Sequence, residues 1–140
     1  MCPVYRNHIK LTEPRFSDET AKQGMWRPLD FLTGGNAGIY FLEPYSDPKT
    51  PILFVHGING SPRNFAYLTE HIDDRAHFQP WLFYYPSGAH LENVAKRLNQ
   101  MVEQLQGQYK FKKIVVIAHS MGGWSRETLF LRTLKVRRIT

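Results

Sequence analysis

A serine between small residues follows an apolar run and has the spacing of a nucleophile elbow. The segment Ala118-His119-Ser120-Met121-Gly122 is a variant of the G-x-S-x-G pattern, in which a sharp strand-to-helix turn lifts the serine hydroxyl out of a sheet. The strained backbone of such a turn requires small residues two positions before and after the serine, and Ala118 and Gly122 meet this requirement. The Met121 amide would then point at the oxyanion that forms when Ser120 attacks a carbonyl, aided by the positive end of the helix that begins there. The spacing therefore predicts nucleophilic chemistry at Ser120.

A second loop offers the other donor that an oxyanion hole needs. The segment His56-Gly57-Ile58-Asn59-Gly60 also follows an apolar run. A glycine-rich turn allows the backbone to direct the Ile58 amide toward the pocket that Met121 faces. We expect His56, Gly57 and Gly60 to support this loop, as Ala118, His119 and Gly122 support the elbow. Each loop alone is weak support for a site, but the two together are specific.

The elements around these loops predict a parallel α/β sheet. Continuous apolar runs at 52–55 and 81–85, and the strand expected at 113–118 with apolar residues from Ile114, are typical of strands buried on both faces. Between them, Ser61-Pro62 begins a helix with Phe65, Leu68 and Ile72 on one face, and an amphipathic helix runs from Leu91 to Leu105 and ends at Gly107. The alternation of strand and helix predicts right-handed crossovers, with both loops at the carboxyl edge of the sheet, where such sheets bind ligands.

The chain divides into three parts by charge and hydrophobic pattern. Residues 1–37 have mixed charge, prolines and no sustained periodicity, and we expect an irregular segment with at most short helices. Residues 38–124 carry the α/β pattern, and residues 125–140 form an atypical basic segment. The formal net charge of +6 comes entirely from residues 111–140, since residues 1–110 hold eleven basic and eleven acidic residues. A solvated tail explains this better than a nucleic-acid interface, and contact with a membrane surface stays open as an alternative.

Composition limits the remaining classes. With 42% hydrophobic and 14% aromatic residues among 140, the chain is neither intrinsically disordered nor collagenous. Cys2 is the only cysteine, which excludes an intrachain disulfide and a multi-cysteine metal site. No apolar run has the length of a membrane span, and residues 1–30 lack the apolar region of a signal peptide. Compartment stays open, with the cytoplasm as the default, and the oligomeric state is not predicted.

The two loops carry a family resemblance. The runs ILFVHGINGSPRNF and IVVIAHSMGG closely resemble the α/β-hydrolase fold, and within it the bacterial lipases with an A-H-S-M-G elbow; esterases like the GPI inositol deacylases look similar. The resemblance covers residues 39–124. It implies Ser120 as nucleophile, the amides of Ile58 and Met121 as oxyanion hole, and hydrolysis of small ester or lipid substrates through an acyl-enzyme without a cofactor or metal.

The pattern departs from that family after the elbow. The triad acid and histidine should follow the serine, but residues 121–140 contain neither His nor Asp, and Glu127 comes too early for either role. We therefore expect the N-terminal part of a hydrolase, incomplete as it stands. In that case the strand at 113–118 would become a sheet edge. A non-catalytic remnant or interaction module derived from a hydrolase is the alternative.

Other histidines have structural interpretations. His119 adjoins the nucleophile but should point away from it, and we expect His56 to order its loop rather than move protons. His90 opens the long helix, where a role as replacement base is conceivable. The group His71, Asp73, Asp74 and His77 invites a metal site, but solvated charge at a helix end explains it better.

Overall fold

The computed structural model describes residues 5–6, 9–118 and 135–138 of the chain. Three helices lie between the first and second strands, and from the third to the fifth strand helical segments alternate with strands. In chain order they are β1 (Tyr5–Arg6), the 3-10 helix η1 (Pro14–Phe16), α1 (Asp18–Trp26), α2 (Pro28–Thr33), β2 (Gly38–Phe41), β3 (Thr50–Val55), the 3-10 helix η2 (Pro62–Phe65), α3 (Ala66–Glu70), β4 (Phe78–Tyr84), α4 (Leu91–Tyr109), β5 (Lys113–Ala118) and β6 (Lys135–Arg138).

The described strands form one mixed sheet in the order β1-β2-β4-β3-β5-β6. Strands β4, β3, β5 and β6 are mutually parallel, whereas β2 runs antiparallel to β4. The predicted edge at residues 113–118 is wrong, because β6 pairs in parallel with β5 from Lys113 opposite Lys135 to Val116 opposite Arg138. The backbone of this basic segment supplies the missing neighbour, which its sequence did not suggest. Strand β5 therefore has partners on both sides.

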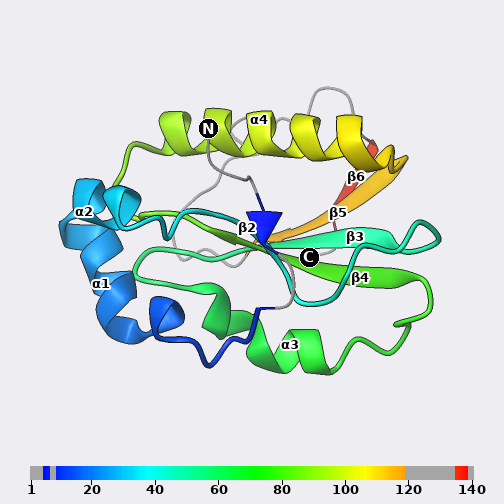
Figure 1. Ribbon diagram of the computed structural model, residues 1–140, viewed down its shortest axis with the longest axis horizontal. Helices are drawn as coiled ribbons and strands as arrows, with labels where there is room; N and C mark the ends of the chain where they lie inside the picture. The colour runs from blue at the N-terminus through cyan, green and yellow to red at the C-terminus, as the bar shows by residue number, and fades with distance from the viewer. Residues whose placement is uncertain (1–4, 7–8, 119–134, 139–140) are drawn as a thin grey trace.

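Helices cover both faces of the sheet, with α4 on one face and α1 and α3 on the other (Figure 1). Alternate strand residues enter the two cores, as the period of two requires. The core beneath α4 contains the strand residues Leu53, Val55, Trp81 and Phe83, against which Leu98 and Val102 of α4 pack. The opposite core contains Tyr40, Phe54, Leu82 and Tyr84. The continuous apolar runs of the sequence are explained by this burial on both faces.

The segment before Gly38 takes part in the core on the α1 side. Phe16 and Phe31 are completely buried. Phe16 meets the ring of Tyr40 edge-on, with 5.2 Å between the centroids, and Phe31 meets the ring of Tyr84 at 4.8 Å. The sequence predicted at most short helices in this segment. The structure has two α-helices there, α1 of nine residues and α2 of six. The segment thus contributes two fully buried aromatic anchors to the fold.

Two predicted helix features differ from the structure. The helix after Ser61 begins as the 3-10 helix η2, so its residues have a different phase, and Phe65 and Thr69 are buried while Leu68 is exposed. The long helix α4 does not end at Gly107 but continues to Tyr109. Its C-cap, Lys110, has the left-handed conformation that ends many helices, with φ of 56°. No helix within the described ranges is long and apolar enough to cross a membrane.

Candidate functional site

The two loops that the sequence singled out leave the sheet side by side. Strands β3 and β5 are parallel neighbours, and Val55, the last residue of β3, is the register partner of Ala118, the last residue of β5. Adjacent strands lie about 4.8 Å apart, so the residues that follow Val55 and Ala118 start from adjacent points on the carboxyl edge. Of the predicted elbow, only Ala118 is described; His119, Ser120, Met121 and Gly122 lie outside the described residues.

The loop after β3 is a tight turn. The Gly60 amide donates to the Gly57 carbonyl oxygen across 3.0 Å. Asn59, the third residue of the turn, has φ of 59°, whereas Ile58 is not among the residues with positive φ. Positive φ at the third position alone is the pattern of a type II turn, and Asn is one of the residues that tolerate it. A Cβ at Gly60 would lie 2.8 Å from Asn64 Oδ1 and 2.9 Å from the Gly57 oxygen, so this position needs glycine.

Within the described residues, the amides of Asn59 and Gly60 in this turn are bonded and the Ile58 amide is not. The Gly60 amide closes the turn, and the Asn59 amide donates to Ser87 Oγ across 3.1 Å. The Ile58 amide has no hydrogen-bond acceptor among residues 9–118, and Ile58 is 61% exposed. An N–H that has no acceptor among the described residues, in a turn at the carboxyl edge of the sheet, is the kind of donor that can stabilise a developing oxyanion.

The imidazole of His56 is buried and holds the turn to the neighbouring strand. Its ring stacks on the ring of Tyr85 with 4.1 Å between the centroids. The Tyr85 amide donates to Nε2 across 3.3 Å, and the Tyr85 hydroxyl donates to the His56 carbonyl oxygen across 2.6 Å. Because Nε2 accepts, Nδ1 carries the proton and donates to the Gly57 oxygen across 2.9 Å. Both ring nitrogens are therefore occupied within the structure.

Burial also keeps this imidazole neutral. Desolvation is the largest influence on the pKa of His56 and lowers it to about 4, against a smaller opposing effect of the hydrogen bonds to Gly57 and Tyr85. The Nε2 lone pair that would accept a proton is taken by the Tyr85 amide, and the lowered pKa makes the ring a weak base, so His56 is not suited to act as a general base. His56 is thus a structural group of the loop.

The remaining described histidines lie on exposed surface. The His71 ring stacks on Tyr67 with 4.0 Å between the centroids. His77 Nδ1 lies 2.7 Å from Asp74 Oδ1, and His90 is the N-cap of α4. Within the part of the chain that the structure describes, no three His, Cys, Asp or Glu side chains gather in a way that could hold a metal ion.

Comparison with known proteins bears on the fold that these loops belong to. A family model described as an alpha/beta hydrolase of unknown function (DUF915) matches residues 83–135. The match runs from the end of β4 through α4 and β5 and includes the predicted elbow. The chain has the N-terminal portion of an α/β-hydrolase fold.

A solved structure is also similar to this α/β-hydrolase portion. It is the mature form of lipase BlEst2 from Bacillus licheniformis, with 18% sequence identity and a TM-score of 0.47. The similarity covers 62% of this chain and 36% of the lipase chain, so the chain spans little more than a third of that lipase. No curated protein matches the sequence.

Sequence reasoning missed the partners of the turn. It assigned no role to Ser87, which accepts the Asn59 amide, and it placed Tyr85 only in the apolar run at 81–85. Both residues follow β4 and lie close to the loop through long-range contacts, 28 and 29 residues away in sequence. No local pattern signals such a contact. The neighbouring Ser61-Pro62 helix start was recognisable, because capping is local.

Proposed function

We propose that this chain is part of a serine hydrolase that acts on carboxylic esters. Ser120 Oγ attacks the acyl carbon, the carbonyl electrons move to oxygen, and the amides of Ile58 and Met121 stabilise that oxyanion. Collapse of the intermediate expels the alcohol, which takes up the proton lost by the serine. Water then hydrolyses the acyl-enzyme to release the acid and restore Ser120. Small ester or lipid molecules are the substrates.

The register of β3 and β5 is the observation that supports this proposal most. Val55 and Ala118 are paired, so the Ile58 turn and the predicted elbow begin next to each other on one edge of the sheet. The unpaired amide of Ile58 adds a donor at that edge. An oxyanion hole requires such convergence of a backbone donor and a nucleophile from two separate loops.

The base and acid of the triad need a source. Among the described histidines, His56 is committed to its loop, and residues 121–140 contain neither His nor Asp. We therefore place the triad histidine and acid outside these 140 residues. A general base contributes about 10²–10⁴-fold to such a reaction, so we expect the chain to react slowly without one.

Chemical rescue tests this assignment. A fluorophosphonate probe should label the folded chain slowly, and imidazole added to the buffer should accelerate labelling by supplying the base in solution. Peptide mapping should place the label on Ser120, and Ser120→Ala should abolish it. A folded chain that shows no labelling of Ser120, with or without imidazole, would contradict the proposal and favour a non-catalytic remnant.

A further inference from the structure

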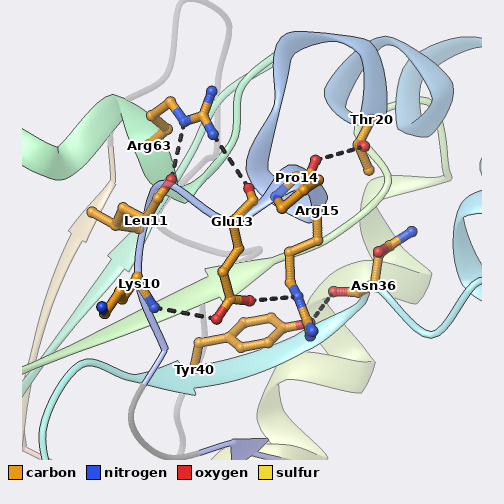
Figure 2. A network of polar contacts seen from close by, with 9 residues as sticks. All are labelled: Lys10, Leu11, Glu13, Pro14, Arg15, Thr20, Asn36, Tyr40 and Arg63. Atoms are coloured by element: carbon orange, nitrogen blue, oxygen red, sulfur yellow. Dashed lines mark hydrogen bonds and ion pairs between the residues drawn. The ribbon is translucent and has the colours of Figure 1, made fainter.

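The helix start that follows the turn is bonded to the N-terminal segment. The guanidinium of Arg63 in η2 donates from Nε to the Leu11 oxygen across 3.0 Å and from Nη2 to the Glu13 oxygen across 3.3 Å (Figure 2). Ser61 Oγ donates to the oxygen of buried Phe16 across 3.1 Å. Residues 61–63 thus hold three carbonyl groups of residues 11–16, about 50 positions earlier in the sequence.

This part of the N-terminal segment is itself well bonded. The Glu13 carboxylate accepts from the Lys10 amide across 3.4 Å and pairs with Arg15 Nε at 2.9 Å (Figure 2). The Arg15 guanidinium lies over the ring of Tyr40, a residue of β2, at 5.7 Å from its centroid. Phe16 packs against the same ring. The segment is therefore anchored to the sheet and can restrain what is bonded to it.

The turn is also bonded on its other side. Ser87 Oγ accepts the Asn59 amide at 3.1 Å and lies 3.7 Å from the sulfur of Met25, at the end of α1. Next to it, the Gly88 amide donates to the Gly24 oxygen across 3.1 Å. A Cβ at Gly88 would collide with the Met25 carbonyl, which indicates how closely the two segments approach.

Apart from these contacts, the turn is held by its own Gly60–Gly57 bond and by His56 at the Gly57 oxygen, and not by side-chain packing. Ile58 and Asn59 are exposed and Gly57 and Gly60 are only partly buried, so side-chain packing cannot fix the position of the Ile58 amide. An oxyanion donor must nevertheless be held within about 0.5 Å of its productive position. Ser87 also takes the Asn59 amide, so within the described residues Ile58 is the one amide of 58–60 without an acceptor.

We propose that Arg63 and Ser87 are positioning residues of the oxyanion turn, through which residues 11–25 of the N-terminal segment hold the Ile58 amide in place. The inference rests on the proposed function. It assigns these two side chains a role through the turn and not through contact with substrate.

Hydrogen exchange of the Gly60 amide tests the restraint without relying on catalysis. The substitutions leave the Gly60 amide and its acceptor at Gly57 unaltered, so the exchange rate of this amide reports how often the turn opens. We expect Arg63→Met and Ser87→Ala each to accelerate its exchange by about threefold to tenfold, the loss of one to two hydrogen bonds, with amides of α4 unchanged. Ser87→Thr keeps the hydroxyl and should restore slow exchange. Arg75→Met is the matched control. Arg75 Nη2 also donates to a backbone oxygen, that of Thr69 across 2.5 Å, but this bond does not involve the turn.

Fluorophosphonate labelling of Ser120 in imidazole gives the second measurement. Arg63→Met and Ser87→Ala should lower the labelling rate by about tenfold or more, because misplacement by 1 Å costs up to about a hundredfold, and Arg75→Met should not. Unchanged Gly60 exchange in both variants would overturn the inference. Equal acceleration of exchange in α4 would also overturn it, because that indicates general destabilisation. If the parent chain labels, an unchanged labelling rate in the two variants would overturn it as well. If the unmodified chain does not label, the proposed function fails, while faster Gly60 exchange still supports the restraint.

Discussion

At the scale of single residues, a neutral imidazole joins the turn after β3 to the chain after β4. His56 accepts the Tyr85 amide at Nε2 and donates to Gly57 from Nδ1. Protonation of Nε2 would set two donors against each other, and burial would leave the new charge without water. The loop is therefore compatible with only one protonation state of this histidine, and its stability must depend on pH.

The direction of that dependence follows from the lowered pKa. The pKa of His56 is about 4 in the folded protein and about 6.5 in the unfolded chain. Between these values the unfolded state binds more protons, so the free energy of unfolding falls as the pH falls. We expect His56 to account for a loss of about 3 kcal/mol between pH 7 and pH 4.

Urea unfolding at a series of pH values measures this loss. The variant His56→Gln cannot titrate, so it should lose correspondingly less stability over the same interval, although it is less stable at pH 7. An equal loss in both proteins would show that folding does not lower the pKa of His56.

The residue scale also shows which site features the sequence could predict. The small residues around Ser120 and the glycine turn at 57–60 follow from local spacing, and the turn is present in the structure. The tautomer of His56 depends on Tyr85, and the bonding of the Asn59 amide depends on Ser87. Such contacts arise from packing between distant segments and leave no periodic signal.

At the scale of elements, α4 shows what periodicity fixes and what it does not. The predicted stripe is buried from Val94 to Leu105, with Val94, Leu98 and Leu105 in the core, whereas its first residue, Leu91, is exposed. The helix nevertheless continues through Gly107, because its last turn is held by tertiary contact: the Tyr109 ring stacks on Tyr45 with 4.0 Å between the centroids. Such packing outweighs the roughly 1 kcal/mol that glycine costs inside a helix.

Two helical glycines should respond in opposite ways to the same substitution. A Cβ at Gly107 would meet open space, whereas a Cβ at Gly24 in α1 would lie 3.0 Å from the Phe31 ring and 3.2 Å from Pro86 Cα. We expect Gly107→Ala to raise the free energy of unfolding by about 0.5–1 kcal/mol through helix propensity. Gly24→Ala gains the same propensity but must displace a buried ring, so it should be destabilising by about 1–3 kcal/mol.

Urea unfolding of the two variants beside the parent provides the comparison. The difference between them isolates packing from propensity, since both replace glycine by alanine within a helix. A stabilising Gly24→Ala would mean that Phe31 is not held tightly between α1 and the sheet. A destabilising Gly107→Ala would mean that the helix does not continue to Tyr109.

At the scale of the whole molecule, the N-terminal segment is part of the site's framework. The sequence before Gly38 has no sustained period, because its contribution comes from single anchors such as Phe16 and Phe31 and from hydrogen bonds to Arg63. The sheet core could be predicted from apolar runs, whereas this segment could not. The same holds for β6, whose basic residues gave no sign that its backbone pairs with β5.

The central claim at this scale is that loops from β3 and β5 form one reaction centre. It predicts that the Ile58 amide, from one loop, controls the reactivity of Ser120 in the other. Ile58 is the second residue of a type II turn, a position where proline is common. Ile58→Pro therefore deletes the N–H while keeping the turn, and Ile58→Ala keeps the N–H while removing the side chain.

The most direct measurement is the rate of fluorophosphonate labelling of Ser120 in these two variants, in imidazole, with Gly60 exchange to verify that the turn is intact. Loss of one oxyanion donor costs about 10²–10³-fold, so Ile58→Pro should label at least a hundredfold more slowly than the parent, and Ile58→Ala within a few-fold of it. Equal labelling of Ile58→Pro and the parent, with the turn intact, would contradict the account.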